Sequence, residues 1–243
     1  MRILIVSDIH SNLVALETVL AVTGAYDQLW NLGDTIGYGP RPNECVAAVE
    51  HADVLIAGNH DLASLGKVNL NDFNPDARTA NIWNGEQLTP ENRALLEALP
   101  PRYDIDAQFL AVHASPREPI WEYLLTQEQA RDNFKLFDTQ VCLIGHSHVP
   151  LAFWLRPDGR VDGPSVVDDG QTIELQSDTR YFFNPGSVGQ PRNQDPRAAY
   201  AILDTDAGAI TFHRIEYDIA QTQRQMTDAK LPIALIRRLE YGM

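Results

Sequence analysis

Five short apolar segments of this sequence each end at side chains that commonly bind metal ions. The clearest is residues 141–144, a run of four apolar residues that leads into Gly145, His146, Ser147 and His148. Such a run is long enough for a buried strand, and the glycine lets the backbone turn sharply after it. The other segments are 3–6, 29–32, 54–57 and 109–112. The first leads to Asp8 and His10, the second to Asp34, the third to Asn59, His60 and Asp61, and the fourth to His113. Because ligands in open α/β sheets lie beyond the carboxyl ends of the strands, we expect these five ends to meet.

Strand and helix patterns alternate over the first sixty residues, with short connections. The predicted strands are 2–7, 27–32 and 53–57, and the predicted helices are about 13–23 and 42–50. Asn12 is a favourable N-cap, and Pro42 is favourable at a first helical position. This alternation predicts a parallel α/β unit. Asp8 and His10, two residues apart in extended backbone, then project to the same side.

An insertion follows the third strand and is predicted to form a helical cap at about 62–100, beside the site, where it would decide substrate selectivity. Asn74–Pro75 and Thr89–Pro90 begin two of its helices, and a capping-box pattern begins another helix near 126–134.

Beyond 148, the strand-like segments are 151–156, 172–175, 180–183, 198–203 and 209–217. They predict a mostly antiparallel second sheet, closed by helices from about 219, within one domain over 1–243.

Charge excludes one large class of partner. The formal net charge is −14, which argues against binding of extended nucleic acid, because that affinity depends on Lys and Arg neutralising phosphates. A small phosphate ester stays possible as a ligand if cations are bound locally.

Cys45 and Cys142 are expected to be buried thiols rather than a disulfide. No apolar run approaches the ~18 residues of a membrane span, and no signal peptide is recognisable, so a cytoplasmic protein is expected.

The residues at the strand ends form a mixed set of oxygen and nitrogen donors. They are Asp8, His10, Asp34, Asn59, His113, His146 and His148. Such donors suit divalent Mn, Fe, Co, Ni or Zn better than Ca or Mg, and manganese is the first expectation. Seven ligands exceed what one tetrahedral ion needs, so two ions bridged by Asp34 fit better. Two ions about 3.5–4 Å apart activate a bridging hydroxide and orient a phosphoryl group. This predicts hydrolysis of a phosphate ester or anhydride.

Each motif alone also has a simpler explanation. An Asp-x-His sequence at a strand end is commonly a hydrogen-bonded turn, and Gly-Asn-His-Asp at 58–61 is compatible with a tight turn and N-cap. Their joint presence in this order favours the metal site. His51 and His213 match no motif and are assigned to structure or surface.

Together these motifs resemble those of calcineurin-like metallophosphoesterases, most closely the small bacterial and archaeal phosphodiesterase branch. The resemblance covers positions 8 to 148 and, less specifically, Asn-Pro-Gly-Ser-Val at 184–188. It implies an α/β fold of the α+β sandwich type, with four αββα layers in which two central mixed β-sheets are flanked by helices. It also implies one ion held by Asp8, His10, Asp34 and His148, and a second held by Asp34, Asn59, His113 and His146.

The resemblance further implies that His60 faces the substrate as general acid or transition-state stabiliser, oriented by Asp61. Protein Ser/Thr phosphatases carry an Arg in their Gly-Asp loop, whereas this chain has Gly37–Tyr38 there. That departure favours a phosphodiester or nucleotide anhydride as the substrate. Arg117 and Arg192 are candidates to replace the missing Arg, although a solvated surface position is as plausible for each.

The expected substrate-binding residues are therefore Asn59, His60, Arg117 and Arg192. The aromatic residues Tyr38, Trp83, Trp121 and Tyr123 are candidates for stacking on a base, with packing as the alternative. Two other functions compete with the diesterase: a phosphomonoesterase or protein phosphatase, and a catalytically weak protein-binding scaffold, as in the retromer subunit of this fold. The sequence leaves the physiological substrate, the metal in each site and the oligomeric state open.

Overall fold

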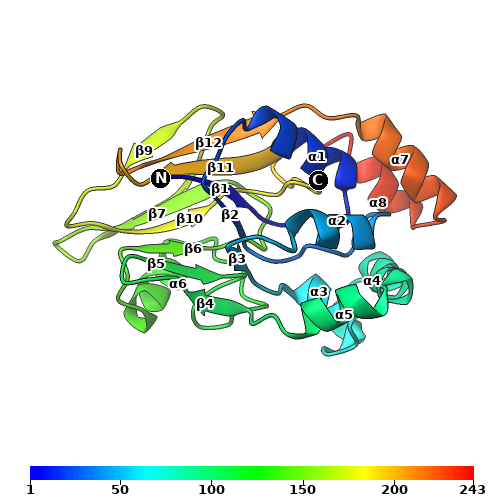
Figure 1. Cartoon of the computed structure of the whole chain (residues 1–243). Coiled ribbons are helices and arrows are strands. Elements are labelled where there is room, and N and C mark those ends of the chain that lie inside the picture. The colour runs from blue at the N-terminus through cyan, green and yellow to red at the C-terminus, as the bar shows by residue number, and fades with distance from the viewer.

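Two six-stranded mixed β-sheets lie face to face in the computed structural model, which describes residues 1–243 (Figure 1). In spatial order the first sheet contains β3 (Val54–Leu55), β2 (Gln28–Asn31), β1 (Arg2–Val6), β11 (Ala198–Asp204), β12 (Ala209–Ile215) and β9 (Thr172–Glu174). The second contains β4 (Arg102–Asp104), β5 (Phe109–Val112), β6 (Val141–Leu143), β10 (Arg180–Asn184), β7 (Leu151–Leu155) and β8 (Val161–Val166).

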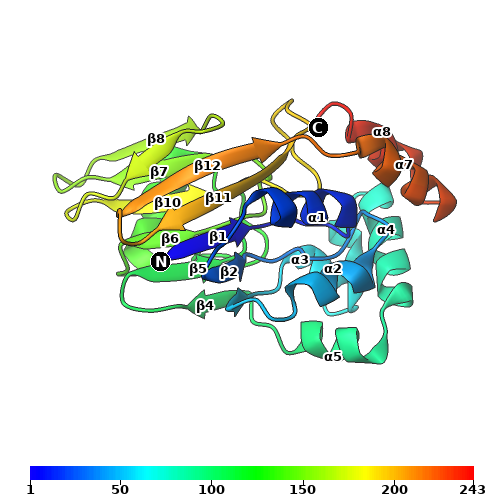
Figure 2. The same ribbon diagram turned by 45° about the horizontal axis from the view of Figure 1, so that its top comes forward.

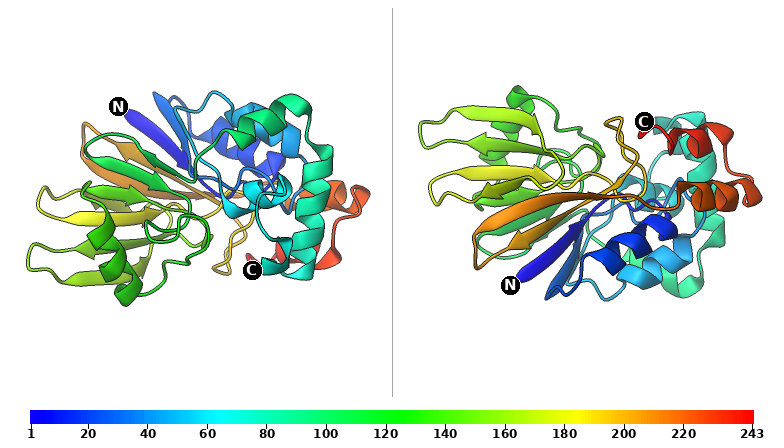
Figure 3. Two further views of the ribbon diagram at one scale, coloured as in Figure 1. Left: turned by 90° about the horizontal axis from the view of Figure 1, so that it is seen from below. Right: turned by 90° about the horizontal axis from the view of Figure 1, so that it is seen from above.

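Helices flank the sheets, and all except α6 gather at one end of them (Figures 1 and 3). They are α1 (Leu13–Val22), α2 (Pro42–Val49), α3 (Asn59–Ser64), α4 (Pro75–Gln87), α5 (Pro90–Glu97), α6 (Gln127–Asn133), α7 (Ile219–Asp228) and α8 (Ile233–Arg238). Two short 3₁₀ turns, η1 (Leu70–Asp72) and η2 (Phe134–Leu136), complete the set. None of the helices combines the length and the apolar character needed to cross a membrane.

Alternating side chains along the strands build the layers. In β1, Ile3 and Ile5 point between the sheets, whereas Leu4 and Val6 point outward to α1 and α2. In β10, Tyr181 and Phe183 join the core between the sheets, and Phe182 joins the outer cluster that α6 covers. The order of the four layers is therefore α1 and α2, first sheet, second sheet and α6. Figure 2 shows the strands of both sheets on one side of the molecule and α1, α2, α4 and α5 on the other. The expected αββα architecture is confirmed.

Parallel pairing brings the functional strand ends together. β1 pairs in parallel with β2, and β2 with β3, so their carboxyl ends share one edge of the first sheet. In the second sheet β5, β6 and β10 are also parallel neighbours. The same end of the molecule holds the helices between β3 and β4 and the C-terminal helices. Ala77 and Ala80 of α4 pack there against Met226 of α7 and Leu235 of α8.

The expected organisation of the C-terminal strands was wrong. They do not form a separate second sheet: β7, β8 and β10 extend one sheet, and β9, β11 and β12 extend the other. Two edge strands, β4 and β8, were not predicted. β8 contains Gly163 and Pro164, and a proline that cannot donate a ladder hydrogen bond is tolerated at a sheet edge. The helix starts at Asn74 and Thr89 are confirmed, because each side chain accepts a hydrogen bond from the backbone three residues on.

Candidate metal centre

Two groups of buried carboxylates and imidazoles lie beyond the carboxyl ends of β1, β2, β5 and β6. The first group consists of Asp8, His10, Asp34 and His148. The second consists of Asp34, His113 and His146. Within each group one ligand atom per residue lies within 4.8 Å of every other. Segments that are up to 140 residues apart in sequence thus meet at one place, with Asp34 common to both groups.

The two oxygens of Asp34 have different surroundings. Oδ1 accepts the backbone N–H of His60 at 2.8 Å. Oδ2 is fully buried and accepts no hydrogen bond. It lies 3.7 Å from Nε2 of His10 and 3.4 Å from Nε2 of His113, between the two groups. A buried carboxylate oxygen without a donor is unfavourable by itself, and a bound cation is the partner that would satisfy it.

Backbone carbonyls orient all four imidazoles. Nδ1 of His10, His113 and His148 contacts the carbonyl oxygens of Ile36, Leu32 and Gln190 at 3.2, 2.8 and 2.5 Å. His146 is reversed, because its Nε2 contacts the Trp121 carbonyl at 3.2 Å. Since a carbonyl only accepts, the contacting nitrogen carries the hydrogen. The other nitrogen therefore faces the cluster, as it does in histidines that bind metals.

His10 and His148 are arranged unfavourably unless a cation lies between them. Their Nε2 atoms are 3.0 Å apart, and both Nδ1 atoms are already bonded to carbonyls. Burial lowers the pKa of both imidazoles, so both are neutral and two lone pairs face each other. Nδ1 of His146 faces the second group, and burial and the nearby His113 lower its pKa to about 3.

His113, unlike His10, His146 and His148, has a raised pKa, because it lies next to the Asp34 carboxylate. Burial lowers the pKa of His113, but the Asp34 carboxylate outweighs burial and raises it to about 9. Burial raises the pKa of Asp34, but the surrounding imidazoles, His113 above all, together outweigh burial and hold that pKa well below the usual range. Without a metal, His113 thus carries a proton at neutral pH and forms an ion pair with Asp34.

The backbone at the site is strained in a consistent way. Asp8, His10, Asp34, His146 and His148 all have φ between 50° and 63°, a left-handed conformation that non-glycine residues seldom adopt. Each such residue costs about 1–2 kcal/mol, and strain of this kind is typical of functional sites. The expected reason for the proximity of Asp8 and His10 was therefore wrong. They meet because the chain coils after β1, with Asp8 Oδ1 at 3.9 Å from His10 Nε2.

Asn59, His60 and Asp61 begin helix α3 beside these groups. Oδ1 of Asn59 lies 3.3 Å from Nε2 of His113. Asp61 accepts the backbone N–H groups of Ile36 at 3.0 Å and Gly58 at 2.8 Å, so its carboxylate caps α3 and ties it to the loop after β2. Burial and the Asp34 charge raise the pKa of Asp61 to about 7.

The expected contact between Asp61 and His60 is not formed. Nδ1 of His60 instead lies 2.8 Å from Oδ1 of Asn81, a fully buried residue of α4. Sequence reasoning missed Asn81. The available signal was a pair of asparagines, Asn81 and Asn84, three residues apart inside a predicted helix, where asparagine is unfavourable without a partner.

The two candidate phosphate-binding arginines differ. Arg117 forms ion pairs with Glu122 and with Asp132, and its side chain is about half exposed. Arg192 forms no ion pair with a carboxylate. Its guanidinium donates to Oε1 of Gln190 at 2.9 Å and to the hydroxyls of Tyr38 at 3.2 Å and Tyr123 at 3.4 Å.

These two tyrosines place Arg192 beside the metal-ligating candidates. The ring of Tyr38 lies 4.7 Å from that of His10, and the ring of Tyr123 stacks on His146 at 4.2 Å. The backbone N–H of Arg192 also donates to the carbonyl of His148 at 3.3 Å. An unneutralised guanidinium therefore lies next to both groups of buried donors.

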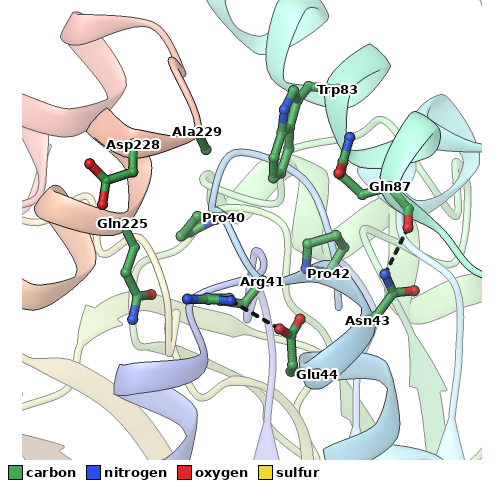
Figure 4. A pocket seen from close by; sticks show the side chains of 10 residues that line it. All are labelled: Pro40, Arg41, Pro42, Asn43, Glu44, Trp83, Gln87, Gln225, Asp228 and Ala229. Carbon is green, nitrogen blue, oxygen red and sulfur yellow. Dashed lines mark hydrogen bonds and ion pairs between the residues drawn. The ribbon is translucent and has the colours of Figure 1, made fainter.

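A cavity of about 310 Å³ lies between α2, α4 and α7 (Figure 4). Trp83 and Arg41 line it together with mostly polar side chains, and none of the metal-ligating candidates does. Trp83 thus faces this cavity rather than the two groups. Trp121 packs on Phe73, with ring centroids 5.3 Å apart, and Phe73 in turn contacts the ring of His60.

Comparison with known proteins identifies the family to which this fold belongs. Residues 1–208 match the model of the calcineurin-like phosphoesterase superfamily domain. The crystal structure of a metallophosphoesterase from Sphaerobacter thermophilus is 48% identical, with a TM-score of 0.90, and the match covers 100% of this chain and 99% of that one. The uncharacterized protein MJ0912 of Methanocaldococcus jannaschii is 36% identical over 247 residues, covering 99% of this chain and 98% of that protein.

A crystal structure of the protein PH1004 from Pyrococcus horikoshii OT3 shares the fold at 18% identity, with a TM-score of 0.79 and coverage of 100% and 98%. The chain belongs to the calcineurin-like phosphoesterase family. The family expected from the motifs is thus confirmed, and with it a metal-dependent hydrolase of phosphoric esters.

Proposed function

We propose that this protein hydrolyses a phosphodiester or a nucleotide phosphoanhydride with two divalent metal ions. Asp8, His10, Asp34 and His148 would hold one ion, and Asp34, Asn59, His113 and His146 the other. Manganese is our first candidate, and Fe, Zn, Ni or Co suit the same donors.

One observation carries the two-ion proposal: the unpaired oxygen of Asp34 lies between two sets of donors. Oδ2 of Asp34 has a histidine nitrogen on each side, at 3.7 and 3.4 Å. The facing Nε2 atoms of His10 and His148 add a second electrostatic conflict that a cation would relieve. A single ion would leave one of the two sets unused.

The metal ions, when bound, would lower the pKa of a shared water and neutralise charge on the phosphoryl group. The protein side chains would supply the rest. The ring centroid of His60 lies 4.9 Å from that of His10, and its backbone N–H donates to Asp34, which both groups share. Nδ1 of His60 contacts Asn81, whereas its Nε2 forms no hydrogen bond. We assign His60 to proton donation toward the leaving oxygen, a role worth about 10²–10⁴-fold in rate. Asp61 would hold the helix that carries it.

Charge supports the choice of a diester or internal anhydride over a phosphomonoester. The phosphate group of a diester carries one negative charge on its non-bridging oxygens, whereas that of a monoester dianion carries two. Arg192 lies beside the site without a carboxylate partner, and its guanidinium donates only to the Gln190 amide and to two tyrosine hydroxyls, which a phosphate oxygen can replace. Arg117 would have to leave its two carboxylates before it could bind substrate.

A metal-supplemented screen tests this proposal. Purified protein would be assayed with Mn²⁺ on aryl phosphodiesters, cyclic nucleotides, dinucleoside polyphosphates and phosphomonoesters, and its metal content measured. We expect two ions per chain and turnover of diesters or anhydrides above monoesters. Asp34→Asn should abolish turnover without unfolding the protein, and so should His146→Ala. A folded protein that binds no metal and hydrolyses none of these compounds would instead indicate a protein-binding scaffold.

A further inference from the structure

We infer that Asn81 is the positioning residue for His60, and that the helix α4 is thereby part of the reacting site. The inference rests on the proposed function, because it concerns the group assigned to leaving-group protonation. It does not concern metal binding, since Asn81 contacts none of the ligand candidates other than through His60.

The contact between Asn81 and His60 is short and buried. Oδ1 of Asn81 lies 2.8 Å from Nδ1 of His60, and the two residues are 0% and 4% exposed. Tyr38 and Phe73 pack on the imidazole with ring centroids at 4.3 and 4.9 Å. The aromatic rings restrict where the imidazole lies, and the asparagine fixes its rotation about the ring axis.

The chemistry of the amide assigns the hydrogens of His60. An amide oxygen only accepts hydrogen bonds, so Nδ1 of His60 carries a hydrogen. In the neutral imidazole Nε2 is then left with its lone pair, free to take up a proton and deliver it to a leaving oxygen. Asn81 therefore selects the tautomer in which the nitrogen away from α4 is the reactive one.

The neighbouring Asn84 shows what a purely structural asparagine looks like in the same helix. Its Oδ1 accepts from Ser11 Oγ at 2.5 Å and from the Gly37 N–H at 3.1 Å, and its Nδ2 donates to the Gly39 and Ala80 carbonyls. Asn84 thus uses both ends of its amide to hold the loop after β2. Asn81 uses one end only.

A purely structural role does not explain the asparagine at position 81, because its buried Nδ2 forms no hydrogen bond. A buried unsatisfied donor costs about 1–3 kcal/mol, which an apolar residue at this position would avoid. The only polar contact that the side chain makes is the one with His60. Asparagine here is accounted for by the orientation of that imidazole.

The hydrogen bond can be tested without any metal or substrate. Long-range ¹H–¹⁵N NMR spectra of the metal-free protein distinguish protonated from unprotonated imidazole nitrogens. We expect His60 to show a protonated Nδ1 and an unprotonated Nε2 at pH 8. In Asn81→Ala this preference should be lost. A parent protein with the proton on Nε2 would overturn the inference.

Kinetics of the metal-loaded enzyme give the second readout. We expect Asn81→Ala to lower kcat by about 10- to 100-fold on aryl phosphodiesters with poor leaving groups, a part of what a general acid supplies. Loss should be small on a nitrophenyl ester, and KM and metal content should not change. Asn81→Asp keeps an acceptor at the same place and should restore the tautomer and much of the rate.

Asn84→Ala is the matched control on the same helix. It should destabilise the protein and lower kcat by a similar factor for good and poor leaving groups. An Asn81→Ala variant with that same uniform loss, or with no loss, would overturn the positioning role. If the parent protein hydrolyses no phosphate ester at all, the proposed function fails, whereas the NMR result still decides whether Asn81 orients His60.

Discussion

Substitution of Gly58 by alanine tests the geometry of the carboxylate shared by the two groups. An added Cβ at this position would lie 2.0 Å from Oδ1 of Asp34 and 2.6 Å from its backbone nitrogen. The backbone of Gly58, with φ −102° and ψ 179°, is allowed for any residue. The substitution therefore acts by collision and not by backbone strain.

The size of the effect follows from the collision. Cβ contacts below 3.0 Å essentially do not occur, so the Asp34 carboxylate has to retreat by about 1 Å. A misplacement of about 1 Å in a site costs about 100-fold in rate, or about 2.7 kcal/mol. We expect Gly58→Ala to lower both the Mn²⁺ affinity and the turnover rate by about 100-fold. The free energy of unfolding should fall by about 1–3 kcal/mol through overpacking.

Gly66→Ala is the control for backbone strain without collision. Gly66 has φ +72° and nothing within 4 Å of an added Cβ, so alanine there is strained but collides with nothing. It should lower the free energy of unfolding by about 1–2 kcal/mol and leave metal affinity unchanged. Calorimetric Mn²⁺ titration and urea unfolding of both variants provide the measurements. A Gly58→Ala protein that binds Mn²⁺ within twofold of the parent would refute the reasoning.

Three further predictions concern other parts of the molecule. Metal ligands must be deprotonated, and the metal-free protein holds a proton on His113 up to a pKa of about 9. Apparent Mn²⁺ affinity should therefore rise by about tenfold per unit from pH 7 to 9 and then flatten, as measured by calorimetry; a flat profile over that range would contradict this. Arg192→Gln should raise KM for a diester by about tenfold or more with metal content unchanged, and an unaltered KM would argue against a phosphate contact. Phe182→Ala removes a fully buried ring in the outer core of the second sheet and should lower the free energy of unfolding by about 3–5 kcal/mol in urea denaturation, while a loss below about 1 kcal/mol would show that this core is loosely packed.

The sequence predicted which residues come together at the strand ends, because the signals for this are local. Each ligand candidate lies within four residues of the end of an apolar run, and parallel neighbours such as β1 and β2 must bring their carboxyl ends to one edge. The N-terminal helices were predictable for the same reason, since caps such as Asn12 act within one turn.

Long-range arrangement was not predictable in this way. Nothing in the strand β9 itself indicates that it pairs with β12 in the first sheet while β7 and β8 pair in the second, because pairing partners depend on the packing of both sheets. The same holds for Asn81, whose partner His60 lies 21 residues away across a helix contact. Arg117 and Arg192 looked alike in the sequence, and the neighbouring carboxylates that separate them become visible only in the fold.

Anomalous X-ray diffraction from crystals grown with Mn²⁺ tests the central claim most directly. We predict two anomalous peaks about 3.5–4 Å apart, one on either side of Oδ2 of Asp34, with Asp8, His10 and His148 around one and Asn59, His113 and His146 around the other. A single peak, or peaks away from these side chains, would contradict the two-ion centre.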